Sequence, residues 1–324
     1  MEFIGWTRRY IFILFILAFV PTAMYTWTGW TWIAIPWQPI TLIGTATAFI
    51  TGFRNNATYA RSWEARQIWG RIVNSSRAFG IMTMDFIRDE DKTTEKAIHQ
   101  KILFRHIAWL TALRHQLRQK RTWENARTDP RFIEYRKTYT VPEWESNIFA
   151  DMKEFLSEEE IGLLKEKKNV AAQLLAIQSR DLRRLNEEGR IAPLNYVEME
   201  VVLKELYDHQ GGTERIKNFP YPRQFATIND FFILLFVLMV PVGLLSEFSR
   251  MGKYDVWFNV PFSIIVSWIF ITLEAVGEST ENPFEGASND VPISSISRLI
   301  EIDLKEFLGL PVPPPLEPVN HILM

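Results

Sequence analysis

The residues that could do chemistry are concentrated in one string, residues 53–70, which reads FRNNATYARSWEARQIWG. On a helix Arg61 and Glu64 lie three residues apart and can form an ion pair. Arg54, Asn55 and Tyr59 can satisfy polar groups where a helix leaves a bilayer. A solvated amphipathic helix would explain the charges, but it does not explain why further amide and indole side chains share so short a stretch. These further side chains are Asn56, Trp63 and Trp69.

The sequence offers little support for an enzyme. It has no cysteine, which excludes disulfides, thiolate metal sites and a cysteine nucleophile. The five histidines, at positions 99, 106, 115, 209 and 321, form no H-E-x-x-H or similar ligand set. No G-x-S-x-G turn or glycine-rich phosphate loop occurs. We therefore expect His106 and His115 to be packing residues of helices, and a membrane enzyme is the least supported function.

The residues of the 53–70 string follow a long run without charged side chains, which must form the helices that position them. Tyr10 to Phe53 carries no charged side chain, and two further apolar runs cover Phe231–Ser246 and Val256–Leu273. A bilayer crossing needs about 20 apolar residues, so the first run is long enough for two crossings. We expect four spans, at residues 10–25, 39–53, 231–245 and 256–273, with the second helix continuing to about residue 70. Glu274 ends the last run, where an acidic residue is either functional or simply exposed at a helix end.

Four segments follow from these runs. Residues 1–53 hold the first two spans, 54–230 form a charged helical region, 231–273 hold the last two spans, and 274–324 form a C-terminal segment with a proline-rich tail. Within the charged region we expect helices at Ala97–Arg118, Val170–Asn186 and Tyr196–His209, and a capping box at Ser157–Glu160. Gly211–Gly212 is expected to end this helical region. The net charge of −2 gives no indication of nucleic-acid binding.

Basic residues beside the spans indicate the orientation. The basic residues that flank the spans on one side are Arg8, Arg9, Arg54 and Arg223, whereas the loop between the first two spans has no charge. By the positive-inside rule, both termini and the charged region are expected in the cytoplasm of a multi-pass membrane protein. Arg250 and Lys253 oppose this orientation, because they fall in the loop between the last two spans.

The string at 53–70 resembles the end of the second span in the bestrophin family of ion channels, especially its bacterial members. A second match is Glu281-Asn282-Pro283-Phe284, followed by Asn289-Asp290-Val291-Pro292, which resembles the family's acidic Pro-Phe segment after the fourth span. Weaker matches are His115–Arg118 and Gly211–Arg215. The order of spans also agrees, so the resemblance covers nearly the whole chain.

The resemblance implies an all-α membrane protein that forms a homopentamer around a central pore, with lipid outside and monovalent ions inside. Transferred to this chain, Thr45, Phe49 and Phe53 line a hydrophobic neck, and Leu194 lies at a second, cytoplasmic constriction. The neck residues are four apart and therefore share a helical face. Without the resemblance, such a face could equally contact lipid or a neighbouring helix. The remaining motif residues receive structural roles: Arg54, Asn55, Asn56, Tyr59, Arg61, Glu64, Trp69, Glu281, Pro283, Phe284, Asn289 and Asp290.

The aromatic neck bears on selectivity. Ring edges carry partial positive charge and favour an anion, whereas ring faces favour a cation. The resemblance associates an aromatic residue at the level of Phe49 with anion channels, which favours chloride as the permeant ion. Thr45 could offer its hydroxyl to either ion. A cation-selective channel of the same fold and a non-conducting membrane scaffold remain as alternatives.

Calcium is a separate question, because animal bestrophins carry an acidic run after the Pro-Phe pair. Here Glu285–Asp290 contains two carboxylates, too few for the six to eight oxygen ligands that Ca²⁺ takes. We expect no tight calcium site and no other cofactor, and we expect Glu278, Glu281 and Asp290 to be helix caps or subunit contacts. The missing acidic run and the small size favour the bacterial inner membrane.

Overall fold

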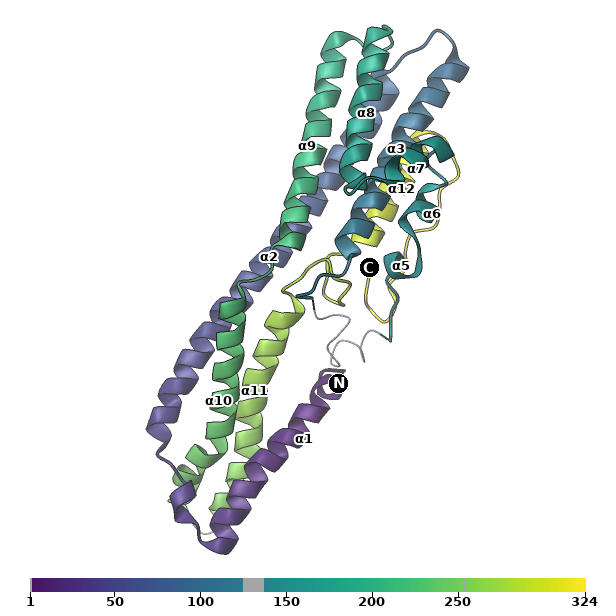
Figure 1. Ribbon diagram of the computed structural model, residues 1–324. Coiled ribbons are helices and arrows are strands. Elements are labelled where there is room, and N and C mark those ends of the chain that lie inside the picture. Colours follow the sequence, from purple (N-terminus) through teal and green to yellow (C-terminus); the bar gives the residue numbers. More distant parts are fainter. Residues whose placement is uncertain (1, 125–136, 253) are drawn as a thin grey trace. The chain divides into compact units, whose positions relative to one another are not determined.

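The computed structural model describes residues 2–124, 137–252 and 254–324 (Figure 1). The chain divides into two compact units. We call Met1–Arg61 with Pro220–Glu281 the membrane unit, and Ser62–Phe219 with Asn282–Met324 the polar unit. Arg250 lies in the described part of the last interspan loop, whereas Lys253 lies outside the described residues.

The membrane unit is built from four long helices. They are α1 (Glu2–Ala23), the first part of α2 (Trp37–Phe86), α10 (Arg223–Phe248) and α11 (Asn259–Ser279). A π-helical turn, Met24–Thr28, extends α1, and 3-10 turns cover Thr31–Ile33 and Asp255–Phe258. All four are long and apolar enough to cross a bilayer. The predicted all-α architecture with four spans is therefore confirmed.

Apolar and small side chains hold the membrane unit together. Helices α1, α10 and α11 contact one another, and Figure 1 shows them running side by side. Phe236 of α10 packs against Gly44 of α2 so closely that a Cβ atom at Gly44 would lie 2.5 Å from the Phe236 ring. The buried Asn259 side chain donates to Thr22 Oγ1 at 2.8 Å and to the Pro241 carbonyl at 3.0 Å. Small residues and satisfied polar groups are what close packing of membrane helices requires.

The polar unit is an assembly of helices around α3 (Lys92–Arg118). The helices that pack against α3 include α5 (Pro142–Glu145), α6 (Ile148–Met152), α8 (Val170–Glu187), α9 (Pro193–Asn218) and α12 (Ile293–Phe307). Helix α7 (Glu158–Lys165) contacts α6 and α8. Side chains of α3 fill the centre of the unit, where Leu103, Trp109 and Leu113 are fully buried.

Local sequence signals explain where these helices begin. Ser157 and Glu160 form the predicted capping box of α7. The Asp91 side chain accepts from the backbone N–H groups of Thr93 and Thr94 at the start of α3. Asn169 caps α8 in the same way, by accepting from Ala172 N at 2.9 Å. Each cap satisfies a backbone donor that the first helical turn leaves unpaired.

Two helices run further than the sequence predicts. Helix α2 ends at Phe86 rather than near Gly70, and α9 passes through Gly211 and Gly212 to end at Asn218. A glycine inside a helix costs only about 1 kcal/mol relative to alanine. Tertiary packing outweighs that cost here. Phe79 is fully buried beyond Gly70, and Ile216 is buried beyond Gly212.

The proline-rich tail returns to its own unit. Residues 311–318 have no regular secondary structure, and an isolated bridge joins Val319 to Ile322. Ile322 and Met324 then pack against Tyr139 and Val141. The Met324 carbonyl accepts from Ser295 N, at the start of α12, at 2.6 Å. The tail therefore forms a strap that is fastened at both ends.

Candidate functional site in the membrane unit

One face of α2 is exposed and aromatic. Phe49 is 67% exposed and Phe53 is 60% exposed, and Thr45 lies exposed one turn earlier. The two rings meet edge to face, with centroids 4.5 Å apart and planes at 90°. The Thr45 hydroxyl donates to the Thr41 carbonyl at 2.8 Å, so it presents oxygen lone pairs outward rather than a proton. In the part of the chain that the structure describes, this face stays uncovered.

The opposite face of α2 is buried and carries small or polar residues. Its members recur at alternating intervals of four and three residues, as in a helix that packs along its length. Thr51 Oγ1 donates to Asn229 Oδ1 of α10 at 2.8 Å, and Asn229 is fully buried. The buried members are Ile40, Gly44, Thr47, Thr51, Arg54 and Thr58.

Arg54 is the charged member of this buried face. Its guanidinium, 4% exposed, contacts three carboxylates: Asp230 at 2.9 Å, Glu281 at 3.2 Å and Glu274 at 3.7 Å. The cluster joins α2 to α10 and to the end of α11. Burial raises the pKa of the Glu281 carboxyl, although Arg54 opposes this shift. Glu274, predicted to be either functional or exposed, is 16% exposed and belongs to this cluster.

Asn55 fastens the same end of α2 to α11. Its Nδ2 donates to the Leu273 carbonyl at 2.8 Å, and its side chain lies so close to Gly277 that a Cβ atom there would overlap with it. One turn later, Thr280 Oγ1 donates to Thr58 Oγ1 at 3.1 Å. The residues that follow Phe53 therefore attach α2 to the other helices of the membrane unit.

The other residues of the string fall into different surroundings. The Glu64 carboxylate is bound by Arg215 of α9, a longer-range partner on a packed helix, and its pairing with Arg61 stays a prediction. Trp69 is fully buried in the core of the polar unit. Asn56 and Tyr59 are exposed.

The Pro-Phe segment belongs to the polar unit and is a compact turn. Phe284 is 1% exposed within the core, and the Pro283 carbonyl accepts from Val291 N at 3.1 Å. Asp290 binds Arg118 at 2.7 Å and accepts from Gly286 N at 2.7 Å. Burial raises the pKa of Asp290 to about 6, against the opposing effect of Arg118. Asn289 is exposed.

Glu281 and Asp290 bind cations within the chain, Glu281 at Arg54 and Asp290 at Arg118. The expectation that Glu278, Glu281 and Asp290 are helix caps or subunit contacts stays a prediction. Among the described residues, no group of three or more histidine or acidic side chains is arranged to hold a metal ion.

Leu194 and the two histidines lie in the polar unit. Leu194 is the second residue of α9 and is 81% exposed. His106 is buried, with Nε2 2.9 Å from Ser76 Oγ, and burial lowers its pKa to about 3. His115 Nε2 lies 2.8 Å from Asp151 Oδ2. Both histidines pack within the unit, as predicted.

Sequence reasoning missed the partners of α2. Asn229 and Asp230 supply an amide and a carboxylate to its buried face. Both stand directly before the third apolar run, next to Phe231. Two polar residues at the start of an apolar membrane helix could have indicated these partners, because polar groups close to the bilayer interior need hydrogen-bond or charge partners.

Comparisons with known proteins agree with this architecture. The chain matches the family described as bacterial/fungal bestrophin protein over residues 7–306. A curated voltage-dependent anion channel-forming protein of Ralstonia nicotianae is 27% identical over 302 residues, which cover 93% of this chain and 87% of that protein. One of the same description from Escherichia coli K12 is 26% identical over 292 residues, covering 90% and 83% of the two chains.

A solved structure shares the fold. The crystal structure of a bacterial bestrophin homologue from Klebsiella pneumoniae matches with a TM-score of 0.77 and 23% sequence identity. The match covers 93% of this chain and 98% of that one. It therefore extends over both the membrane unit and the polar unit.

Proposed function

The chain belongs to the bacterial and fungal bestrophin family, and we propose that it forms a homopentameric membrane channel for small monovalent anions such as chloride. The observation that carries this proposal is the exposed face of α2. Large aromatic side chains lie exposed there while the opposite face is packed and polar. Five such faces around an axis would give a narrow apolar neck at Thr45, Phe49 and Phe53. Such a neck can gate by excluding water.

The anion assignment has two supports. The curated relatives in Ralstonia and Escherichia coli are described as anion channel-forming proteins. The perpendicular rings of Phe49 and Phe53 are the second support. Because one ring is turned by 90° relative to the other, at least one of the two can direct its partially positive edge toward a passing ion.

A cation channel of the same fold is the second candidate, and two observations favour it. The Thr45 hydroxyl uses its proton within the helix, so it offers oxygen lone pairs, which attract cations. Three carboxylates gather around the Arg54 guanidinium, directly after Phe53 in the sequence. The sign of the reversal potential across a salt gradient separates the two candidates.

The surroundings of the neck follow from the same proposal. The protein would lie in the bacterial inner membrane with both termini and the polar unit in the cytoplasm. There the polar unit would form a vestibule. Leu194, exposed at the start of α9, would supply the second constriction.

Planar bilayer recordings of the purified protein test the proposal. We expect wild type to conduct with an anion-selective reversal potential, and Phe49→Ala to raise conductance and weaken selectivity because it widens the neck. Phe12→Ala is the matched control, since Phe12 lies on α1 and is 66% exposed, almost as much as Phe49. This control should behave as wild type.

Silence of both wild type and Phe49→Ala would remove the channel function. Cross-linking then distinguishes the remaining alternative, because a non-conducting scaffold could yield monomers, whereas a channel requires five-fold species. A reversal potential of cationic sign would leave the neck in place and replace the ion.

A further inference from the structure

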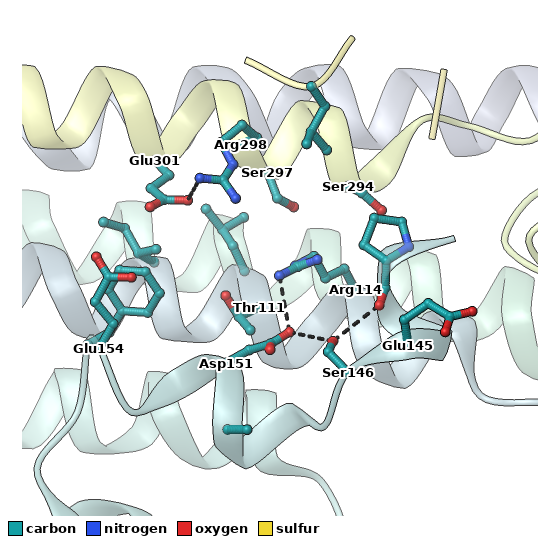
Figure 2. A pocket seen from close by; sticks show the side chains of 16 residues that line it. Thr111, Arg114, Glu145, Ser146, Asp151, Glu154, Ser294, Ser297, Arg298 and Glu301 are labelled. Atoms are coloured by element: carbon teal, nitrogen blue, oxygen red, sulfur yellow. Dashed lines mark hydrogen bonds and ion pairs between the residues drawn. The ribbon is translucent and has the colours of Figure 1, made fainter. Parts of the chain in front are cut away.

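The polar unit contains a cavity of about 510 Å³ between α3, α6, α12 and the C-terminal strap. A cavity of this volume falls within the range of small-molecule sites. Figure 2 shows its lining, in which polar side chains from α3, α5, α6 and α12 converge. Apolar side chains also line the cavity, namely Ile107, Leu110, Phe155 and Leu316 of the strap.

The cavity contains hydrogen-bonding groups that the chain itself does not use. Ser297 is 6% exposed, and its Oγ atom has no hydrogen-bond partner among the described residues. Figure 2 shows this hydroxyl directed into the cavity, above Arg114. Thr111, 4% exposed, also lines the cavity. A buried hydroxyl without a partner carries a free-energy penalty, which a ligand in the cavity would remove.

The charges of the lining are unbalanced. Five carboxylates line the cavity or pair with its lining, against three cationic side chains, which leaves two negative charges in excess. The carboxylates are Glu143, Glu145, Asp151, Glu154 and Glu301, and the cations are Arg114, Arg298 and Lys305. The excess favours a ligand with more than one positive charge.

The carboxylates are also separated in space. Figure 2 shows Glu145 at one end of the cavity, and Glu154 and Glu301 at the other end. Asp151 lies between them, where it contacts Arg114 at 3.6 Å and accepts from Ser146 Oγ at 2.8 Å. A ligand that suits this arrangement has cationic groups at both ends and an aliphatic chain between them.

We propose that this cavity binds a linear aliphatic diamine or polyamine. One ammonium group would lie beside Glu145, the other beside Glu154 and Glu301, and the chain would pass under Leu316. The Ser297 hydroxyl would accept a hydrogen bond from an amine. This site is separate from the pore proposal, since every residue in it belongs to the polar unit, whereas the neck residues belong to the membrane unit.

Calorimetric titration of the purified full chain in detergent with putrescine, repeated with spermidine, tests the proposal. We expect one saturable site per chain at physiological salt. Glu145→Gln should weaken binding roughly tenfold, as for the loss of a charged hydrogen bond. Ser297→Ala should weaken it several-fold without lowering the thermal unfolding midpoint, because its hydroxyl has no partner to lose. Ser297→Leu, which fills the cavity, should abolish binding.

Two controls make the result specific. Glu166→Gln removes the same charge from an exposed residue at the end of α7, outside the cavity, and should leave binding unchanged. Butylamine, which has a single ammonium group, should bind at least tenfold more weakly than putrescine. The proposal is overturned by an absence of saturable heat, by equal weakening in Glu166→Gln and Glu145→Gln, or by equal affinities for the two amines.

Discussion

The two faces of α2 differ in whether their side chains find partners within the chain. On the buried face, Thr51 binds Asn229, Arg54 binds three carboxylates and Gly44 receives the Phe236 ring, all within one chain. On the other face, Phe49 and Phe53 contact each other and otherwise lie exposed. The same helix therefore has one face that is packed against described residues of its own chain and one face that stays exposed.

This difference suggests separate roles for the two faces: the buried face holds α2 in place, and the exposed face is the one that we assign to conduction. A membrane helix gains little by exposing aromatic rings to lipid, which is as apolar as they are, so packing energy does not explain Phe49 and Phe53. The buried face fixes the rotation of α2 and thereby the direction of both rings. Substitutions on the buried face should accordingly change stability, whereas those on the exposed face should change conduction.

Arg54→Ala is expected to have the largest effect. It removes the guanidinium that binds Asp230, Glu274 and Glu281, and breaking a buried ion pair from one side costs about 3–5 kcal/mol. We expect loss of the folded protein or a large drop in its thermal unfolding midpoint in detergent. Phe53→Ala, at the adjacent position on the exposed face, should unfold near the wild-type temperature. Equal midpoints for the two variants would contradict the assignment of the faces.

Two glycines of α2 give a matched comparison of the same kind. At Gly44 an added methyl group meets the Phe236 ring, and overpacking costs roughly 1–3 kcal/mol. At Gly52 nothing lies within 4 Å of an added Cβ atom. Gly44→Ala should therefore lower the unfolding midpoint and Gly52→Ala should not. A lower midpoint for Gly52→Ala than for Gly44→Ala would show that the two faces are exchanged.

Acid should act on the polar unit through His106. Its pKa is about 3 when folded and near 6.5 when unfolded, because burial disfavours the cation. The unfolded chain thus binds the proton first, and the stability is complete above pH 6.5 and declines as the pH falls toward 3, by at most about 1.4 kcal/mol per pH unit. In His106→Phe we expect a flatter dependence of the unfolding midpoint on pH.

Asp290 acts in the opposite sense, since its pKa is raised when folded, and it favours the folded state as the pH falls from about 6 toward 3.8. Its contribution is common to wild type and His106→Phe, so the difference between their pH profiles isolates the histidine. Identical slopes for the two proteins would show that His106 is not the titrating group.

Calcium should have the smallest effect. The two acidic side chains of Glu285–Asp290 include Asp290, which is already bound to Arg118, so little remains to coordinate the ion. Chelation with EGTA should leave the bilayer current within about twofold of its value in micromolar calcium. Abolition of the current by EGTA, with recovery on adding calcium, would contradict this expectation.

The sequence predicts the features that depend on local pattern. Charge-free runs locate the four spans, and Ser157 with Glu160 locates the start of α7. Gly70 and Gly211 mislead because a helix end depends on what packs beyond the glycine, which local sequence does not contain. The partner of Glu64 is missed for a related reason, since Arg215 is distant along the chain.

The candidate neck shows a different limit. The spacing of Thr45, Phe49 and Phe53 predicts a shared helical face, but spacing alone does not say whether that face meets lipid, another helix or a pore. The buried face of α2, from Ile40 to Thr58, shows which face is turned away from the other helices of the membrane unit. Its partners, Asn229 and Asp230, come from the second sequence segment of that unit, far along the chain.

The absence of native cysteine allows the most direct test of the shared pore. Single cysteines placed by Phe49→Cys and Phe12→Cys can be exposed to a charged methanethiosulfonate reagent during bilayer recording. We predict that the reagent abolishes or strongly reduces the current of Phe49→Cys and leaves that of Phe12→Cys unchanged. A conducting Phe49→Cys channel whose current is unaffected, despite complete labelling of its thiol, would contradict the assignment of this face to the pore.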